Sequence, residues 1–137
     1  MSGPLDIAAV RDALAELFTD TLPGDVTVYA RGVDGTFNSP AVVIGQPGVE
    51  FEVGPCMDRW TLGVAVAVER SGIDETATQQ LLEDTWPMVV SALNAWIDEG
   101  DWPAGVARVA MPRADFGTLT VAGLGYPAQE ITIEIYG

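Results

Sequence analysis

The stretch from Asp58 to Arg70, DRWTLGVAVAVER, alternates strictly between two kinds of side chain. One set of alternate positions carries large apolar residues, from Trp60 to Val68, and the other is built around Gly63, Ala65 and Ala67. Successive side chains of a strand leave opposite faces of the sheet, so this period predicts a β-strand. A half-exposed strand would carry polar residues on its second face. The small residues instead predict close approach of a helix or of another subunit, and the helix that follows in the sequence is the favoured partner.

Two amphipathic helices are predicted. Apolar residues recur at helical spacing over 5–18 and again over 74–97. Asp74 is the expected N-cap of the second helix. Pro87 lies inside that helix, where proline removes a backbone hydrogen bond. We therefore expect either a kink between Glu83 and Pro87 or two helices that meet there.

The remaining chain reads as strands joined by short links. Strands are predicted over 26–30, 41–45, 58–70, 106–111 and 130–136, with short strands possible at 49–53 and 119–122. The segment 112–127 contains two prolines and three glycines and is expected to be mainly a loop. This order predicts one domain over 1–137 of the α+β class: a mostly antiparallel mixed sheet of about five strands with two helices packed on it.

Charge and residue usage exclude several functions. The chain has a net charge of −14, from 20 acidic and 6 basic residues, and all the basic residues are arginine. Tight binding to nucleic acid or to an anionic membrane relies on Lys and Arg contacts, so neither is expected. No window approaches the roughly 20 apolar residues of a membrane helix, and the N-terminus lacks the basic region of a signal peptide. The single cysteine, Cys56, cannot form an internal disulfide, which favours folding in a reducing compartment.

No constellation of catalytic or metal-binding residues stands out. The absence of histidine excludes the histidine-dependent nucleophilic triads and the common zinc sites. The acids in DEGDWPAG lack the spacing of a calcium loop. Cys56 is followed closely by Arg59, which could activate a thiol, but a half-buried structural cysteine is the preferred interpretation. We therefore predict that the protein is not an enzyme and needs no cofactor. Trp102, in a polar loop, is the tryptophan most expected to touch a partner.

Three segments carry a resemblance to a known family. SPAVVIGQP, the run CMDRWTLGVAVAVERSGIDETATQQLLEDTWPMVVSALN, and the ending ITIEIYG resemble, in order and spacing over 1–137, the tail terminator (tail-completion) proteins of long-tailed, non-contractile phages. The resemblance implies a virion protein, assembled in the host cytoplasm, that forms a ring, typically a hexamer. Such a ring caps the tail tube, ends its polymerisation, and provides the surface that joins tail to head. Its partners would be itself, the tail tube protein and a head–tail connector protein, and DNA would pass through the lumen without specific binding. An acidic lumen fits that passage, because it would not grip the phosphate backbone.

Interfaces are expected on the polar segments between elements, at 46–57 and 112–127. The candidate contact residues are Arg59, Trp102, Phe116, Arg113 and Tyr126, with Phe116 either an apolar anchor for a partner or a plug of the core. Two alternatives remain. One is another head–tail connector, such as a head-closure or minor capsid protein. The other is an acidic immunity or inhibitor protein that binds a basic enzyme, which the net charge would suit.

Overall fold

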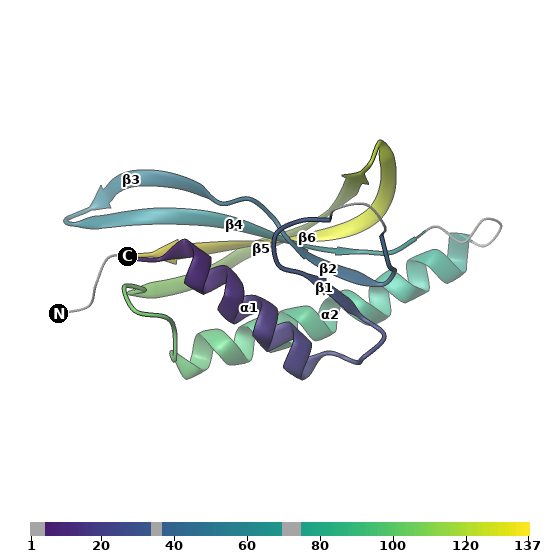
Figure 1. Cartoon of the computed structure of the whole chain (residues 1–137), viewed down its shortest axis with the longest axis horizontal. Coiled ribbons are helices and arrows are strands. Elements are labelled where there is room, and N and C mark those ends of the chain that lie inside the picture. Colours follow the sequence, from purple (N-terminus) through teal and green to yellow (C-terminus); the bar gives the residue numbers. More distant parts are fainter. Residues whose placement is uncertain (1–4, 34–36, 70–74) are drawn as a thin grey trace.

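A computed structural model describes residues 5–33, 37–69 and 75–137 of the chain. Two helices and six strands follow one another as α1 (Ile7–Thr21), β1 (Thr27–Tyr29), β2 (Ala41–Ile44), β3 (Gly48–Gly54), β4 (Met57–Ala67), α2 (Glu75–Glu99), β5 (Arg108–Val121) and β6 (Leu124–Tyr136). Both helices lie on one face of a single sheet (Figure 1). The predicted α+β architecture is confirmed, with six strands in the sheet.

The strands pair in the order β1-β2-β4-β6-β5. Among the described strands, β1 and β2 pair in parallel and the other pairings are antiparallel. β4 is long enough to pair with two strands along one edge: β3 lies beside its first part and β2 beside its last part. The long central strand predicted from the alternating stretch is therefore confirmed, and it organises the whole sheet.

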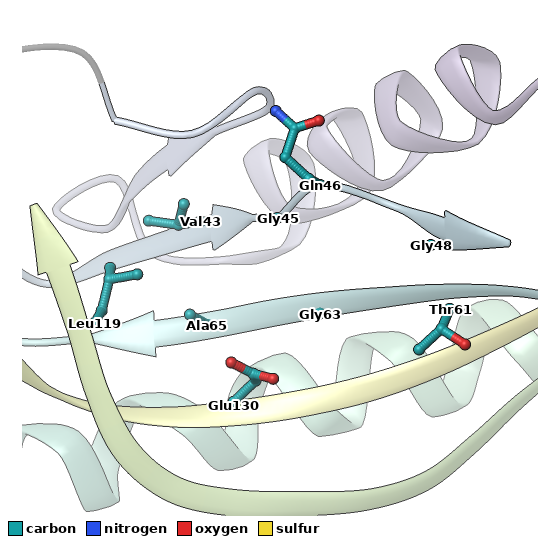
Figure 2. A pocket seen from close by; sticks show the side chains of 9 residues that line it. All are labelled: Val43, Gly45, Gln46, Gly48, Thr61, Gly63, Ala65, Leu119 and Glu130. Atoms are coloured by element: carbon teal, nitrogen blue, oxygen red, sulfur yellow. The ribbon is translucent and has the colours of Figure 1, made fainter.

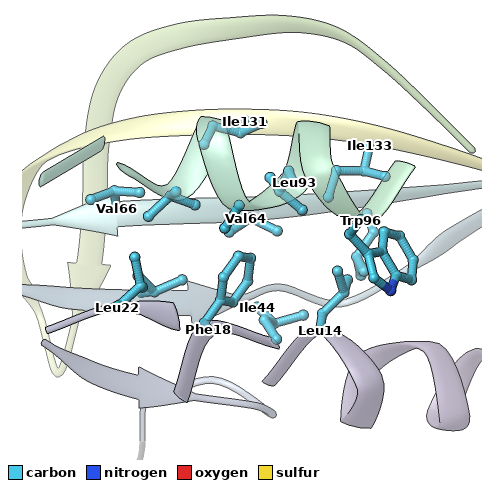
Figure 3. Close-up of a cluster of buried hydrophobic side chains, with 14 of the residues drawn as sticks. Leu14, Phe18, Leu22, Ile44, Val64, Val66, Leu93, Trp96, Ile131 and Ile133 are labelled. Atoms are coloured by element: carbon cyan, nitrogen blue, oxygen red, sulfur yellow. The ribbon is translucent and has the colours of Figure 1, made fainter. Parts of the chain in front are cut away.

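The main core lies between the sheet and the helices (Figure 3). From β4 it takes Leu62, Val64, Val66 and the following Val68, all fully buried, and from β6 it takes Ile131, Ile133 and Ile135. The helices cover this layer with side chains that include Leu14, Phe18, Leu93 and Trp96. The large apolar residues of β4 and β6 therefore share the face of the sheet that the helices cover.

Each helix is close to its predicted range. α1 is capped by Asp6, whose carboxylate accepts hydrogen bonds from the amides of Ala8 and Ala9. α2 runs as one helix through Pro87, so the alternative of two helices meeting there is wrong. The predicted cap Asp74 lies outside the described residues.

The partner expected for the small face of β4 is wrong. α2 packs on the face that carries Val64 and Val66, whereas Ala65 points away from both helices and packs with Ala41 and Val43. Hydrophobic stabilisation scales with the apolar area removed from water, so the helix gains more on the valine face than it would on glycine and alanine. The small residues of β4 therefore lie on the face of the sheet opposite the helices.

The segment 112–127, expected to be a loop, forms most of a long β-hairpin instead. β5 and β6 pair from Arg108↔Tyr136 to Val121↔Leu124, with a register shift between Ala110 and Arg113. Pro112 falls inside that irregularity on an edge strand, where a missing amide breaks no ladder bond. Ala122 and Gly123 both have positive φ, as a tight two-residue hairpin turn requires.

The second hairpin confirms the short strand considered at 49–53 and corrects the interpretation of Cys56. β3 and β4 are joined by a tight turn in which Cys56 has a φ of 55°. Cys56 is exposed there, not half-buried at a strand entrance. In Figure 1 this hairpin and the curled end of the β5–β6 hairpin project from opposite ends of the sheet. We call them the β3–β4 arm and the β5–β6 arm.

Candidate interaction surface on the open face of the sheet

The sheet face opposite the helices, here called the open face, carries the small residues of β4. The pairing register aligns Ala65 with Glu130 of β6 and with Val43 of β2. One row further along, Gly63 is aligned with Thr132, which in turn faces Arg113 of β5. No helix covers this face in the described part of the chain (Figure 1).

A groove of about 400 Å³ runs along the open face. It is lined by residues of five strands and of the β2–β3 link: Val43, Gly45, Gln46, Gly48, Thr61, Gly63, Ala65, Leu119 and Glu130 (Figure 2). The β5–β6 arm curls over the sheet so that Leu119 packs beside Val43 and Ala65. A groove of this size is within the range that accommodates small ligands or side chains. The β4 residues at its floor, Gly63 and Ala65, have small side chains or none. Among the described residues that line the groove, Glu130 is the charged one.

Sequence composition around the groove differs from that of the rest of the chain. Segments 35–49 and 116–129 contain no charged residue, although the chain as a whole carries 20 acids. The first segment supplies Val43 and Gly45 to the groove and the second supplies Leu119. Depletion of charge is the compositional mark of the centre of a protein–protein interface. The two segments therefore bring no charge to the groove, so that Glu130 is the source of repulsion that another chain would meet among its lining residues.

The other end of the open face is charged. The Arg59 guanidinium pairs with Glu50 of β3 and lies 3.7 Å from a carboxylate oxygen of Glu134. Hydrogen bonding to Tyr136, followed by the hydrogen bond and charge of Glu50, raises the pKa of Arg59 above its ordinary value. Arg108 stacks over the Tyr136 ring at 4.3 Å from its centroid. This network ties β3, β4, β6 and the start of β5 together and leaves Arg59 committed to partners within the chain.

Large apolar side chains are exposed on both arms. Phe51 and Val53 on the β3–β4 arm are 70% and 39% exposed, and Phe116 and Leu124 on the β5–β6 arm are 61% and 62% exposed. Phe116 lies on the helix-side face of β5 by register, because it pairs with Gln129, two residues before the buried Ile131. Exposed aromatics at projecting positions are common energetic anchors of interfaces.

The structure separates the candidate contact residues into two groups. Phe116 is exposed and so does not plug the core, and Arg113 is exposed beside the groove, with an ion pair to Asp115. Tyr126 is half-buried and stacks on Phe37 at 4.3 Å between ring centroids. Trp102 is half-buried against Trp96 and donates its indole N–H to the Trp96 carbonyl at 3.1 Å. That packing accounts for Trp102 within its own chain.

Phe51 and the groove itself were not anticipated from the sequence. Phe51 stands between Glu50 and Glu52 in a segment interpreted mainly as a polar connection. An aromatic residue between two acids was a usable signal, because a large apolar side chain in an otherwise polar segment is a candidate interface anchor. The groove depends on the arm that brings Leu119 over β4, a contact between segments far apart in sequence.

Within residues 5–33, 37–69 and 75–137, no three acidic, cysteine or histidine side chains gather as a potential metal site. Neither described helix combines the length and apolar character that crossing a membrane requires. No protein-family model matches the chain, and no curated protein matches it at a significant level.

Proposed function

We propose that this protein is a structural ring component of a phage tail: a tail terminator that caps the tail tube, stops its polymerisation and offers the surface to which the head connector docks. One observation carries the proposal most directly. Two arms project from opposite ends of one sheet and present apolar residues, Phe51 and Phe116 foremost, that have no buried position in their own chain. Different surfaces at opposite ends favour head-to-tail contacts, which close into rings when the rotation between copies allows.

The resemblance described above and the charge of the chain also support this function. If its charge is spread evenly over the surface, a ring of a chain with 20 acidic and 6 basic residues would have a negatively charged lumen. Such a lumen would repel the phosphate backbone and allow DNA to pass without being held. Within the uncharged segments 37–49 and 116–129, the residues that line the groove offer a place where copies could approach despite that charge.

Negative-stain electron microscopy of the purified full-length chain, combined with light scattering across a salt series, tests the ring. We expect particles of uniform diameter with an open centre and a mass of several chains. A protein that stays monomeric at every salt concentration contradicts the proposal. A monomer that binds a basic nuclease tightly would instead identify an acidic inhibitor.

Tube polymerisation separates a terminator from another connector of the same particle. Rings added to polymerising tail tube protein should bind the growing end and shorten the tubes in proportion to ring concentration. A head-closure protein would form rings without that effect. The control is the tube protein alone at the same salt and temperature, because tube growth is itself sensitive to both.

A further inference from the structure

The fold explains one glycine of the groove but not the other. A Cβ on Gly45 would lie 3.2 Å from the backbone oxygen of Gly63, so a side chain at Gly45 would press on the neighbouring strand. The three atoms nearest to a Cβ on Gly63 would belong to the Glu130 side chain, at 3.4, 3.5 and 3.7 Å, which is ordinary contact with a flexible group. Glycine in a strand interior weakens the strand. No tight contact within the chain therefore requires glycine at position 63, and the missing side chain keeps the groove open.

We propose that the groove receives Phe51 from the β3–β4 arm of a second copy of this chain. This contact deepens the ring proposed above and rests on it. Phe51 is the most exposed of the large apolar side chains in the described structure, at 70%. Its own chain cannot use the groove for it, because the arm carries Phe51 away from the groove while Gly48, at the start of the same strand, lines it. Phe51 (the knob) of one copy and the groove (the hole) of the next are different surfaces of the same molecule, so their contact is heterologous.

Charge also specifies the second copy as the occupant. Glu52 follows Phe51, and among the described residues its carboxylate has no hydrogen bond or ion pair. Arg113 lies beside the groove in the row of Gly63 and Thr132, and its guanidinium is 71% exposed. Arg113 is held by Asp115 through an exposed contact of 3.2 Å. Exposed pairs of this kind are weak and exchange readily, so an incoming Glu52 can compete for Arg113 at the rim, opposite Glu130.

Two single variants test the knob and the hole. Phe51→Ala removes the knob, and Gly63→Val fills the hole while placing a β-branched residue in a strand, where it is well tolerated. We expect each to raise the dissociation constant between copies by about 30-fold or more, the usual effect of losing an interface anchor. Neither variant should lower the thermal unfolding midpoint of the monomer appreciably. Phe116→Ala is the matched control: it removes another exposed phenylalanine, from the helix-side face, and should leave ring formation intact.

Charge reversal tests the rim. Glu52→Arg should weaken assembly because two cations then meet at the groove, and combining it with Arg113→Glu should restore assembly. Rescue requires that the two residues meet between copies, so a merely structural role of either residue would not produce it.

Cys56 provides a direct readout of head-to-tail contact. The added cysteine of Gln46→Cys stands at the groove, while Cys56 lies at the tip of the arm. A short thiol-reactive cross-linker should join position 46 of one copy to position 56 of the next and give a ladder of dimers, trimers and larger species. The unmodified chain, with one thiol, can give dimers at most, and Asn94→Cys on the exposed side of α2 should give no ladder.

Rings that persist at wild-type affinity in folded Phe51→Ala and Gly63→Val variants would overturn this contact and leave the ring function standing. Absence of oligomers in the unmodified protein at every salt concentration would overturn both. Loss of rings in the two variants, retention in Phe116→Ala and rescue by the charge swap would establish Phe51 in the groove of the adjacent copy.

Discussion

The backbone amide of Gly45 donates a hydrogen bond to the carbonyl of Gly63, with 2.8 Å between nitrogen and oxygen. The two glycines therefore face each other across β2 and β4, but their tolerance of a side chain differs. A Cβ on Gly45 would lie 3.2 Å from that same carbonyl oxygen, whereas the nearest atoms to a Cβ on Gly63 belong to the Glu130 side chain, at 3.4 Å or more. Replacing each glycine by alanine should therefore change the free energy of unfolding in opposite directions.

Gly45→Ala should lower the free energy of unfolding by about 1–3 kcal/mol, because overpacking against backbone forces the strands apart. Gly63→Ala should raise the free energy of unfolding by about 0.5–1 kcal/mol, the usual difference between alanine and glycine inside a strand. Urea unfolding at low salt and low protein concentration measures both in the monomer. Equal effects of the two substitutions would contradict the asymmetry.

Arg11 is the least satisfied charged side chain in the described structure. It is 7% exposed, and its Nε and Nη2 atoms are buried with no hydrogen-bond partner. Burial, followed by repulsion from Arg31, lowers the pKa of Arg11. A base with a lowered pKa in the folded state destabilises the fold below that pKa, and stability is recovered only as the pH rises through it, far above neutrality. At neutral pH the charge on Arg11 therefore lowers the free energy of unfolding.

We expect Arg11→Met to raise the free energy of unfolding by about 1–3 kcal/mol, because the buried unsatisfied donors disappear while the apolar stem is replaced by a chain of similar length. Arg31→Met is the matched control. Arg31 forms an exposed ion pair with Asp12 at 2.9 Å, and its loss should cost no more than about 1 kcal/mol. Destabilisation by Arg11→Met would show that the guanidinium is solvated in the folded protein.

Pro87 interrupts the hydrogen bonding of α2 without ending it. Proline has no amide hydrogen, so the carbonyl of Glu83 lacks its helical donor at this position. Pro87 lies on the exposed side of the helix. Pro87→Ala should raise the free energy of unfolding by up to about 3 kcal/mol, the difference in helix preference between the two residues. Calorimetry of the two proteins would reveal it; an unchanged midpoint would mean that the helix is already adapted to the proline.

Much of the architecture could be predicted from hydrophobic period alone. The alternation through Val64 and Val66 identified the central strand, and the stripes through Leu14 and Leu93 identified the helices, because burial of an apolar face imposes its own spacing on the sequence. Hydrophobic period alone could not predict which face of β4 the helix α2 covers. A strand with large residues on one face and small ones on the other has two apolar faces, and only the comparison of buried area decides between them.

The β5–β6 arm was missed because its sequence resembles a loop. Pro112 and Gly123 normally interrupt strands, but one lies at a register irregularity and the other in a tight turn, where each is tolerated. The groove was missed with it, since Leu119 reaches Ala65 only when the arm forms. Of the candidate contact residues, Arg113 and Phe116 were identified from composition and position, and Phe51 was not.

Phe116 is expected to serve the tail contacts and not the fold. Its side chain is 61% exposed, and surface substitutions away from caps and cores usually change the free energy of unfolding by no more than about 0.5 kcal/mol. Phe116→Ala should therefore fold normally and still form rings, yet fail to cap tubes, because loss of an aromatic anchor typically costs about 2 kcal/mol or more of binding. Thermal unfolding and tube capping are measured on the same sample. Intact capping would remove Phe116 from the interface.

Assembly should respond to salt in the direction set by net charge. A hexamer would carry six times the −14 of one chain, and repulsion among copies opposes its formation. The screening length falls from about 30 Å at 0.01 M salt to about 8 Å at 0.15 M, whereas apolar contacts such as a phenylalanine in a groove are scarcely affected. We expect a mainly monomeric protein at low salt and micromolar concentration, and more rings as salt rises.

Pairs such as Glu52 with Arg113 would be weakened by salt, but exposed pairs contribute only about 0–1 kcal/mol each, too little to reverse a repulsion shared by every copy. Light scattering with size exclusion at fixed protein concentration measures the balance. Rings that dissociate as salt rises would mean that ion pairs, not apolar contacts, hold the copies together.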